Sequence, residues 1–197
     1  MHIGFVGSPC SGKTTTAAML FASLKEAGYI CEFSIEQARL FIAEKRFNDA
    51  IRQGNLLLTN ENQEEIMRRQ LHTDSILQWI SYGKTITISD SSPLGALFYM
   101  TPEYIQHPTI QNYIKKTCLI CDFLFYSDLV HTCSEYQIEP NRVHDYTQAQ
   151  EIDGKIYNTL KTYSPEIIPK LIPLSGPPLQ RHSKALQIIL QEMNSCP

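Results

Sequence analysis

Residues 5–20 of the chain, FVGSPCSGKTTTAAML, combine an apolar run, a glycine-containing turn and a helix-forming segment in that order. The middle part, residues 7–14, satisfies the pattern G-x-x-x-x-G-K-[ST]. This motif needs a strand before it and a helix after it. Both are predicted, because residues 2–6 form an apolar run and a helical pattern begins at Gly12. The sequence therefore predicts a strand, a tight loop and a helix in direct succession.

Each part of this loop suits the binding of oxygen anions. Gly7 and Gly12 let the backbone turn tightly and approach a ligand closely. The loop amides and the N-terminus of the following helix attract negative charge. Lys13 can place a cation beside the β- and γ-phosphates of a nucleotide, and the Thr14 hydroxyl can bind Mg²⁺. We therefore expect the loop to hold a nucleotide through Gly7, Ser8, Pro9, Cys10, Ser11, Gly12, Lys13, Thr14 and Thr15.

Length and composition indicate an ordinary globular protein. The chain has 197 residues and 43% hydrophobic residues, which suits one domain with a small lid or insert. Its net charge of -3 gives no overall attraction to nucleic acid, although a local basic groove stays open. The apolar runs are far shorter than the roughly 20 residues that span a bilayer. The first residues lack the features of a signal peptide, so we expect a cytoplasmic protein without a membrane partner.

The six cysteines do not form a recognisable metal-binding pattern. They are Cys10, Cys31, Cys118, Cys121, Cys133 and Cys196. Cys118 and Cys121 fit C-x-x-C, but no second pair follows at metal-ligand spacing. We therefore interpret all six as free thiols rather than as zinc ligands or a redox pair.

Apolar runs alternate with helical patterns along the chain, as in a parallel α/β sheet. Further strands are predicted at 30–34, 85–89, 122–129 and 167–174. The prolines in the last of these favour the edge of the sheet. Helices are predicted from about residue 36, over 61–81, around 149–160 and around 186–193. Residues 93–118 are expected to be irregular to helical, and the polar residues 134–147 are expected to form a loop.

Asp90 directly follows the predicted strand 85–89. The carboxyl ends of parallel strands form the edge where such sheets bind ligands. A carboxylate there could hold Mg²⁺ through water together with Thr14, or could contact an attacking group. The alternative is a capping or turn role within the sequence SDSSP, residues 89–93.

Glu36 and Arg39 lie just past the second predicted strand. If a helix begins there, residues three apart share one face, and both side chains would point into the cleft. Glu36 could accept a proton from a hydroxyl group, and Arg39 could hold an anionic part of the same molecule. The alternative is an ordinary surface ion pair.

Arg142 lies in the polar loop that follows the fourth predicted strand. A loop arginine that folds over a transferred phosphate would neutralise the charge on its oxygens. The alternative is a solvated side chain without a role in chemistry.

The chain resembles the P-loop kinases of the nucleoside and polynucleotide kinase group. It is similar to the AAA-type ATPase/kinase family that includes ribosylnicotinamide kinase. The matching segments are GSPCSGKTT (7–15), SIEQARLFI (34–42), TITISDSSPL (85–94), DFLFYSDL (122–129) and NRVHDYTQAQEIDGKIYNTL (141–160). The resemblance implies an α/β three-layer sandwich with a five-stranded parallel sheet in the order 2-3-1-4-5. It also implies one domain over 1–197 with a lid at about 134–147 that carries Arg142.

The same resemblance implies residue roles. In polynucleotide 5′-hydroxyl kinases a carboxylate after the second strand acts as base, with an arginine three residues later, and Glu36 and Arg39 match that spacing. Those kinases usually carry aspartate at this position, so the glutamate is a departure. Their third strand also ends in a segment like Ile88-Ser89-Asp90.

We therefore expect a kinase that depends on ATP and Mg²⁺ and transfers the γ-phosphate to a hydroxyl. The acceptor would be a nucleoside, a nucleotide, or a base or end in DNA or RNA. The alternative is an ATPase with a regulatory or partner-moving role, although no acidic pair follows the third strand. A GTP-dependent switch is not favoured, because the sequence lacks an Asn-Lys-x-Asp motif. Neither the acceptor nor the oligomeric state follows from the sequence.

Overall fold

The computed structural model describes residues 1–47, 59–80, 85–129 and 145–195. They contain a five-stranded sheet in the order β2-β3-β1-β4-β5, which confirms the expected order. Every neighbouring pair of strands is parallel. The strands are β1 (His2–Val6), β2 (Cys31–Ser34), β3 (Ile86–Ser89), β4 (Phe123–Ser127) and β5 (Leu171–Leu174). β1 lies at the centre and is buried along its whole length, so the loop that follows it starts from a rigid base.

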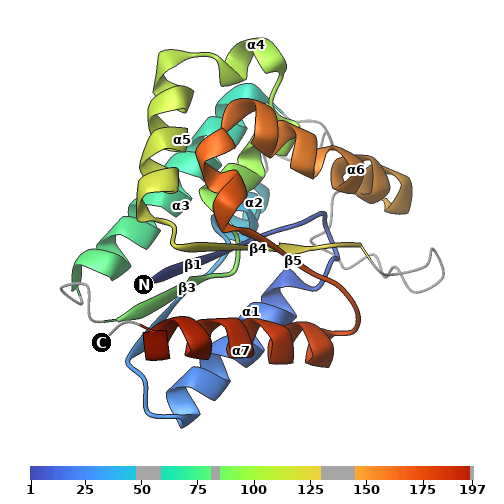
Figure 1. The fold of residues 1–197 in the computed structure, drawn as a ribbon. Coiled ribbons are helices and arrows are strands. Elements are labelled where there is room, and N and C mark those ends of the chain that lie inside the picture. Colours follow the sequence, from blue (N-terminus) through green and yellow to red (C-terminus); the bar gives the residue numbers. More distant parts are fainter. Residues whose placement is uncertain (48–58, 81–84, 130–144, 196–197) are drawn as a thin grey trace.

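Helices cover both faces of the sheet (Figure 1). They are α1 (Lys13–Glu26), α2 (Gln37–Phe47), α3 (Asn60–Ile80), α4 (Pro102–Ile105), α5 (Pro108–Ile120), α6 (Tyr146–Tyr163) and α7 (Pro178–Ser195). The 3₁₀ helices are η2 (Pro93–Tyr99) and η3 (Pro165–Lys170). The helices α1 and α7 pack on one face, and α3, α5, α6 and η2 lie on the other. The three-layer sandwich is thus confirmed. None of these described helices is long and apolar enough to cross a membrane.

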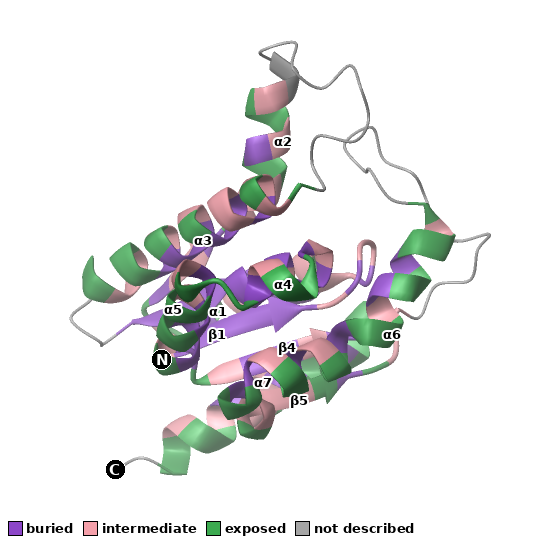
Figure 2. Ribbon diagram, turned by 90° about the horizontal axis from the view of Figure 1, so that it is seen from above, coloured by how far each residue is buried: buried purple, intermediate pink, exposed green. Residues whose placement is uncertain are grey.

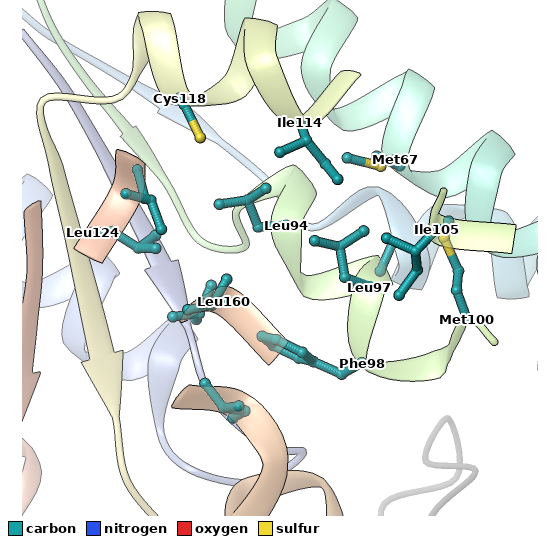
Figure 3. Packing of buried hydrophobic residues seen from close by; sticks show 14 of the residues in the cluster. Met67, Leu94, Leu97, Phe98, Met100, Ile105, Ile114, Cys118, Leu124 and Leu160 are labelled. Atoms are coloured by element: carbon teal, nitrogen blue, oxygen red, sulfur yellow. The ribbon is translucent and has the colours of Figure 1, made fainter. Parts of the chain in front are cut away.

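The core has one large apolar cluster on each side of the sheet and a small third cluster of Phe41 and Ile66 between α2 and α3. On the side of α3 and α5, the close-up in Figure 3 shows η2 side chains such as Leu94 and Leu97 packed against Ile114 of α5 and Met67 of α3. On the other side, Leu20 of α1 is fully buried within the second cluster. Burial of apolar side chains on both faces holds the sheet rigid beneath the loops at its carboxyl edge.

Prolines begin the short helices between β3 and β4. Pro93, Pro102 and Pro108 occupy first-turn positions, where a missing backbone N–H costs nothing. The side chains of Ser92 and Thr101 accept hydrogen bonds from the first turns of η2 and α4. The expectation that 93–118 is irregular to helical is therefore confirmed, with α5 extending to Ile120.

Two boundaries differ from the sequence-based expectations. Residues 165–170 form η3 rather than the first half of a strand, and only Leu171–Leu174 pair with β4. Pro169 lies inside η3 and could not have donated to a strand ladder. As expected, β5 is an edge strand, and its Pro173 is exposed. Residues 145–147 are the N-cap and first turn of α6, because Asp145 and Gln148 form a capping box.

Candidate active site

The loop between β1 and α1 has the backbone that its sequence predicts. Gly12 is in the left-handed region with φ 81°, where a side chain would be strained, and it directly precedes α1. A Cβ at Gly7 would collide with the Ser127 carbonyl and the Ser11 hydroxyl, so no larger residue fits there. Cys10 also has a positive φ, 64°, which is uncommon for a residue with a side chain. The loop is thus held tightly against the end of β4.

The ammonium group of Lys13 lies across this loop. Its Nζ donates hydrogen bonds to the Gly7 carbonyl at 3.0 Å and to the Ser8 carbonyl at 2.9 Å. These contacts tie the first turn of α1 to the start of the loop. The cation and the N-terminus of a 14-residue helix therefore lie at the same place, which favours the binding of an anion.

Asp90 lies beside Thr14 at the carboxyl edge of the sheet. The Thr14 hydroxyl donates to Asp90 Oδ1 at 2.9 Å, and Asp90 is only 3% exposed. Burial raises the pKa of Asp90, and the charge of Glu36 raises it further. The hydrogen bond from Thr14 and the charges of Lys13 and Arg39 act in the opposite direction. Hydroxyl and carboxylate oxygens are the ligands that Mg²⁺ prefers, so this pair fits a magnesium site.

Glu36 and Arg39 lie at the start of α2, close enough to Asp90 to act on its pKa. Glu36 directly precedes the helix, and its Oε2 lies 3.7 Å from Arg39 Nε. The Arg39 side chain is 55% exposed and the Glu36 side chain is 26% exposed, so both are accessible to a ligand. Figure 2 shows α2 extending away from the sheet, with largely exposed and half-buried residues. The structure therefore brings Lys13, Thr14, Glu36, Arg39 and Asp90 together.

Arg181, which the sequence analysis did not single out, holds the loop between β1 and α1 through hydrogen bonds to backbone carbonyls. It is 2% exposed in the first turn of α7. Its guanidinium donates to the Ser11 carbonyl, to the Gly176 carbonyl at 2.6 Å, and to the backbone carbonyl of Asp128 at 2.8 Å. Such a role comes from contacts between residues that are distant in sequence, so no local pattern could have revealed it.

The predicted lid arginine, Arg142, lies outside the described residues, as do residues 134–144 of the predicted lid. Its proposed role stays a prediction. The segment 175–177 after β5 is described, and Gly176 there has φ 91°, a backbone conformation that favours glycine.

The cysteines of the C-x-x-C pattern are packed as structural thiols. Cys118 lies in the apolar cluster shown in Figure 3, and Cys121 is the C-cap of α5. Burial raises the pKa of Cys118 to about 11 and that of Cys121 to about 12, so both stay protonated at neutral pH. Among the described residues, no group of three or more His, Cys, Asp or Glu is placed to hold a metal ion.

Comparisons with known proteins agree with the observed fold. A family model described as an AAA domain matches residues 2–170, which confirms the family expected from the motifs. A crystal structure of NadR protein in complex with NAD and AMP-PNP has a TM-score of 0.67 and 17% sequence identity. A second, of NadR protein in complex with NR, has a TM-score of 0.67 and 16% identity. No curated protein matches the sequence at a significant level.

The two alignments each cover 96% of this chain, but 48% and 50% of the NadR chains. The chain thus spans about half the length of these structural neighbours. At this level of identity the similarity concerns the fold alone.

Proposed function

This chain belongs to the AAA-domain family, and we propose that it is a kinase that transfers the γ-phosphate of ATP to an alcohol. The observation that carries the proposal is the juxtaposition of two groups of residues. Lys13 and Thr14 belong to the phosphate loop, and Asp90 and Glu36 follow two neighbouring strands. A carboxylate that lies close to the phosphate loop and is accessible to solvent is what a hydroxyl acceptor requires.

The phosphate loop would bind and orient the triphosphate. Its backbone amides and the N-terminus of α1 would hold the phosphate oxygens, and Lys13 would exchange its two carbonyl partners for the β- and γ-phosphates. Thr14 and Asp90 would hold Mg²⁺, which neutralises phosphate charge when bound. Most of the rate enhancement would come from positioning and electrostatics rather than from covalent chemistry.

Glu36 would act on the acceptor. As the acceptor oxygen attacks the γ-phosphorus, the bond from that phosphorus to the bridging oxygen of ADP breaks, and the Glu36 carboxylate takes the hydroxyl proton. Arg39, which pairs with Glu36, would hold an anionic or polar part of the acceptor. The larger exposed fraction of Arg39 suits contact with a molecule that enters from solvent.

We propose that the acceptor is a nucleoside or nucleotide. The net charge of -3 does not favour a nucleic-acid duplex over a small acceptor, although DNA and RNA ends belong in the test. Nicotinamide riboside is the first compound to try, because one structural neighbour was solved in complex with NR.

The test is transfer of labelled γ-phosphate from ATP to a panel of nucleosides, nucleotides and oligonucleotides. We expect label on one class of acceptor with the wild-type protein. Glu36→Gln should slow transfer by about 10²–10⁴-fold while ATP binding stays unchanged, because a general base contributes this much. Glu26→Gln, at the exposed end of α1, is the matched control and should transfer at the wild-type rate.

Two results would each contradict one part of the proposal, the kinase activity or the role of Glu36. Release of inorganic phosphate only, whatever acceptor is added, would indicate the alternative, an ATPase. Wild-type transfer by Glu36→Gln would remove Glu36 as the base while leaving the kinase activity in place.

A further inference from the structure

A buried polar network lies between α3 and the sheet, behind the candidate active site. Its five side chains are at most 2% exposed. They are His2, Ser34, Gln70, Asp74 and Ser89, which come from β1, β2, α3 and β3. Burial of so many polar groups in a core costs free energy unless hydrogen bonds compensate for it. The hydrogen bonds of this network are therefore needed for the fold.

Asp74 is the centre of this network. Its Oδ1 accepts hydrogen bonds from Ser34 Oγ at 2.6 Å, from Ser89 Oγ at 2.7 Å and from Gln70 Nε2 at 3.0 Å. Its Oδ2 faces His2 Nε2 at 3.4 Å. One carboxylate on α3 therefore binds the last residues of two neighbouring strands.

The directions of these hydrogen bonds are fixed by the number of available protons. Ser89 has one hydroxyl proton, which goes to Asp74, so the contact of 3.0 Å between Ser89 Oγ and His2 Nε2 must be donated by the ring. Gln70 has two amide protons, and the second goes to Ser34 Oγ at 2.9 Å. Gln70 Oε1 then accepts from the backbone N–H of Gln37 at 2.9 Å.

These contacts end at residues that are the sequence neighbours of Asp90 and Glu36. Ser89 directly precedes Asp90, and Gln37 directly follows Glu36. The Asp90 N–H also donates to the Ser34 carbonyl at 3.0 Å, which joins the two strand ends. The backbone next to Glu36 and the backbone next to Asp90 are therefore both anchored to Asp74 and Gln70 of α3.

We propose that Asp74 is a positioning residue, which with Gln70 sets the placement of Glu36 relative to Asp90. This inference rests on the proposed function, because it assigns a purpose to the separation between base and magnesium ligand. Neither Asp74 nor Gln70 contacts a reacting atom. Their effect is on the geometry of the transfer step, where a displacement of about 1 Å can cost about 10²-fold in rate.

The test compares three variants of the full chain. Asp74→Asn keeps the shape but loses one acceptor oxygen and the charge. Gln70→Met keeps the length but loses both amide contacts. Leu71→Ala, at the neighbouring position on α3, is the control, because it removes buried apolar contacts without touching the network. All three are measured at a temperature at which each is folded.

For Asp74→Asn and Gln70→Met we expect kcat for transfer to fall on the order of 10²-fold. The KM for ATP should stay within about twofold, because the network does not contact the phosphate loop. Leu71→Ala should keep its kcat despite a lower Tm. Equal losses of kcat in Leu71→Ala and Asp74→Asn would overturn the proposal, as would an unchanged kcat in both network variants.

Crystal structures of the variants give a readout that does not depend on activity. We expect the start of α2, and Glu36 with it, to shift relative to Asp90 in Asp74→Asn and Gln70→Met but not in Leu71→Ala. Unchanged positions in both network variants would overturn the proposal. If the wild-type protein transfers no phosphate, the proposed function fails, and the crystallographic comparison still decides whether Asp74 positions these residues.

Discussion

Asp90 and Glu65 are both hydrogen-bonded carboxylates, yet their pKa values are shifted in opposite directions. Asp90, in the candidate active site, has a raised pKa because burial outweighs the help of Thr14 and Lys13. Glu65, on the outer surface of α3, has its pKa lowered to about 2 by hydrogen bonds from Arg68 and Arg69. The distances at Glu65 are 2.7 and 2.8 Å to Arg68 and 2.7 Å to Arg69.

The difference shows that the fold stabilises the charged form of Glu65 but not that of Asp90. Glu65 pairs with two cations of its own helix, Arg68 and Arg69. They lie three and four residues after it, at the spacings that favour ion pairs. Asp90 is surrounded by groups that only partly stabilise its charge, and its ionisation costs free energy of folding. Under the proposed function such a cost is expected, because residues arranged to bind a cation and phosphates are not arranged for stability.

The largest effect is expected from Lys13→Ala, which removes the cation of the phosphate loop. Turnover of ATP should be abolished, because the β- and γ-phosphates lose their direct charge partner. The assay is phosphate transfer with ATP in excess, together with calorimetric titration of ATP. Lys25→Ala, in the last turn of the same helix, is the control and should keep wild-type activity. ATP turnover by Lys13→Ala near the wild-type rate would contradict the role of the loop.

An intermediate effect, on stability, is expected from Asp90→Asn. A raised folded pKa means that stability is fully present below the unfolded value of 3.8 and is lost as the pH rises through the folded pKa. Replacement by a neutral side chain should therefore raise stability at pH 7 by about 1 kcal/mol, or about 2–4 °C in Tm. Thermal unfolding between pH 3.5 and 8 measures this, and the gain should shrink toward the acid end. A lower Tm for the variant at pH 7 would show that the carboxylate is satisfied after all.

The smallest effect is expected from Glu65→Gln. A folded pKa of about 2 means that the carboxylate stabilises the protein above its unfolded value of 4.5, and that this contribution is lost as the pH falls toward 2. The pairs are partly exposed, and water screens them, so the loss at pH 7 should be no more than about 1 kcal/mol. Urea unfolding at low and high salt measures it, and we expect the difference to shrink in 1 M salt. A loss that salt does not reduce would point to packing rather than charge.

The sequence predicted most of the fold because its signals are local. The mostly apolar residues 2–6 and the motif at 7–14 specify a strand, a loop and a helix within a single stretch of chain. The expectation for 167–174 was partly wrong, since apolar residues in this segment suit either a strand or a 3₁₀ turn. Pairing with β4 decides that the strand begins at Leu171, and this starting point cannot be seen in the sequence of the segment alone.

The sequence predicted some residues of the candidate site and missed others. Lys13, Thr14 and Asp90 follow from the motif and from their places after strands, and the structure brings them together. Glu36 and Arg39 follow from their place after the second strand and their spacing of three residues, and in the structure they form a partly exposed pair. Arg181 was missed, because its partners Ser11, Asp128 and Gly176 are brought to it by three different parts of the sheet.

What the sequence by itself determined is the phosphate-binding loop, since a glycine that accepts positive φ, a lysine and a threonine at fixed spacing need only the neighbouring strand and helix. The tertiary structure alone decided which side chains support that loop and the carboxylates opposite it. Asp74 reaches Ser34 and Ser89 across 40 and 15 residues of chain. Contacts at such separations exist only after the sheet has formed, because their geometry is set by how the strands pair and how α3 packs on them.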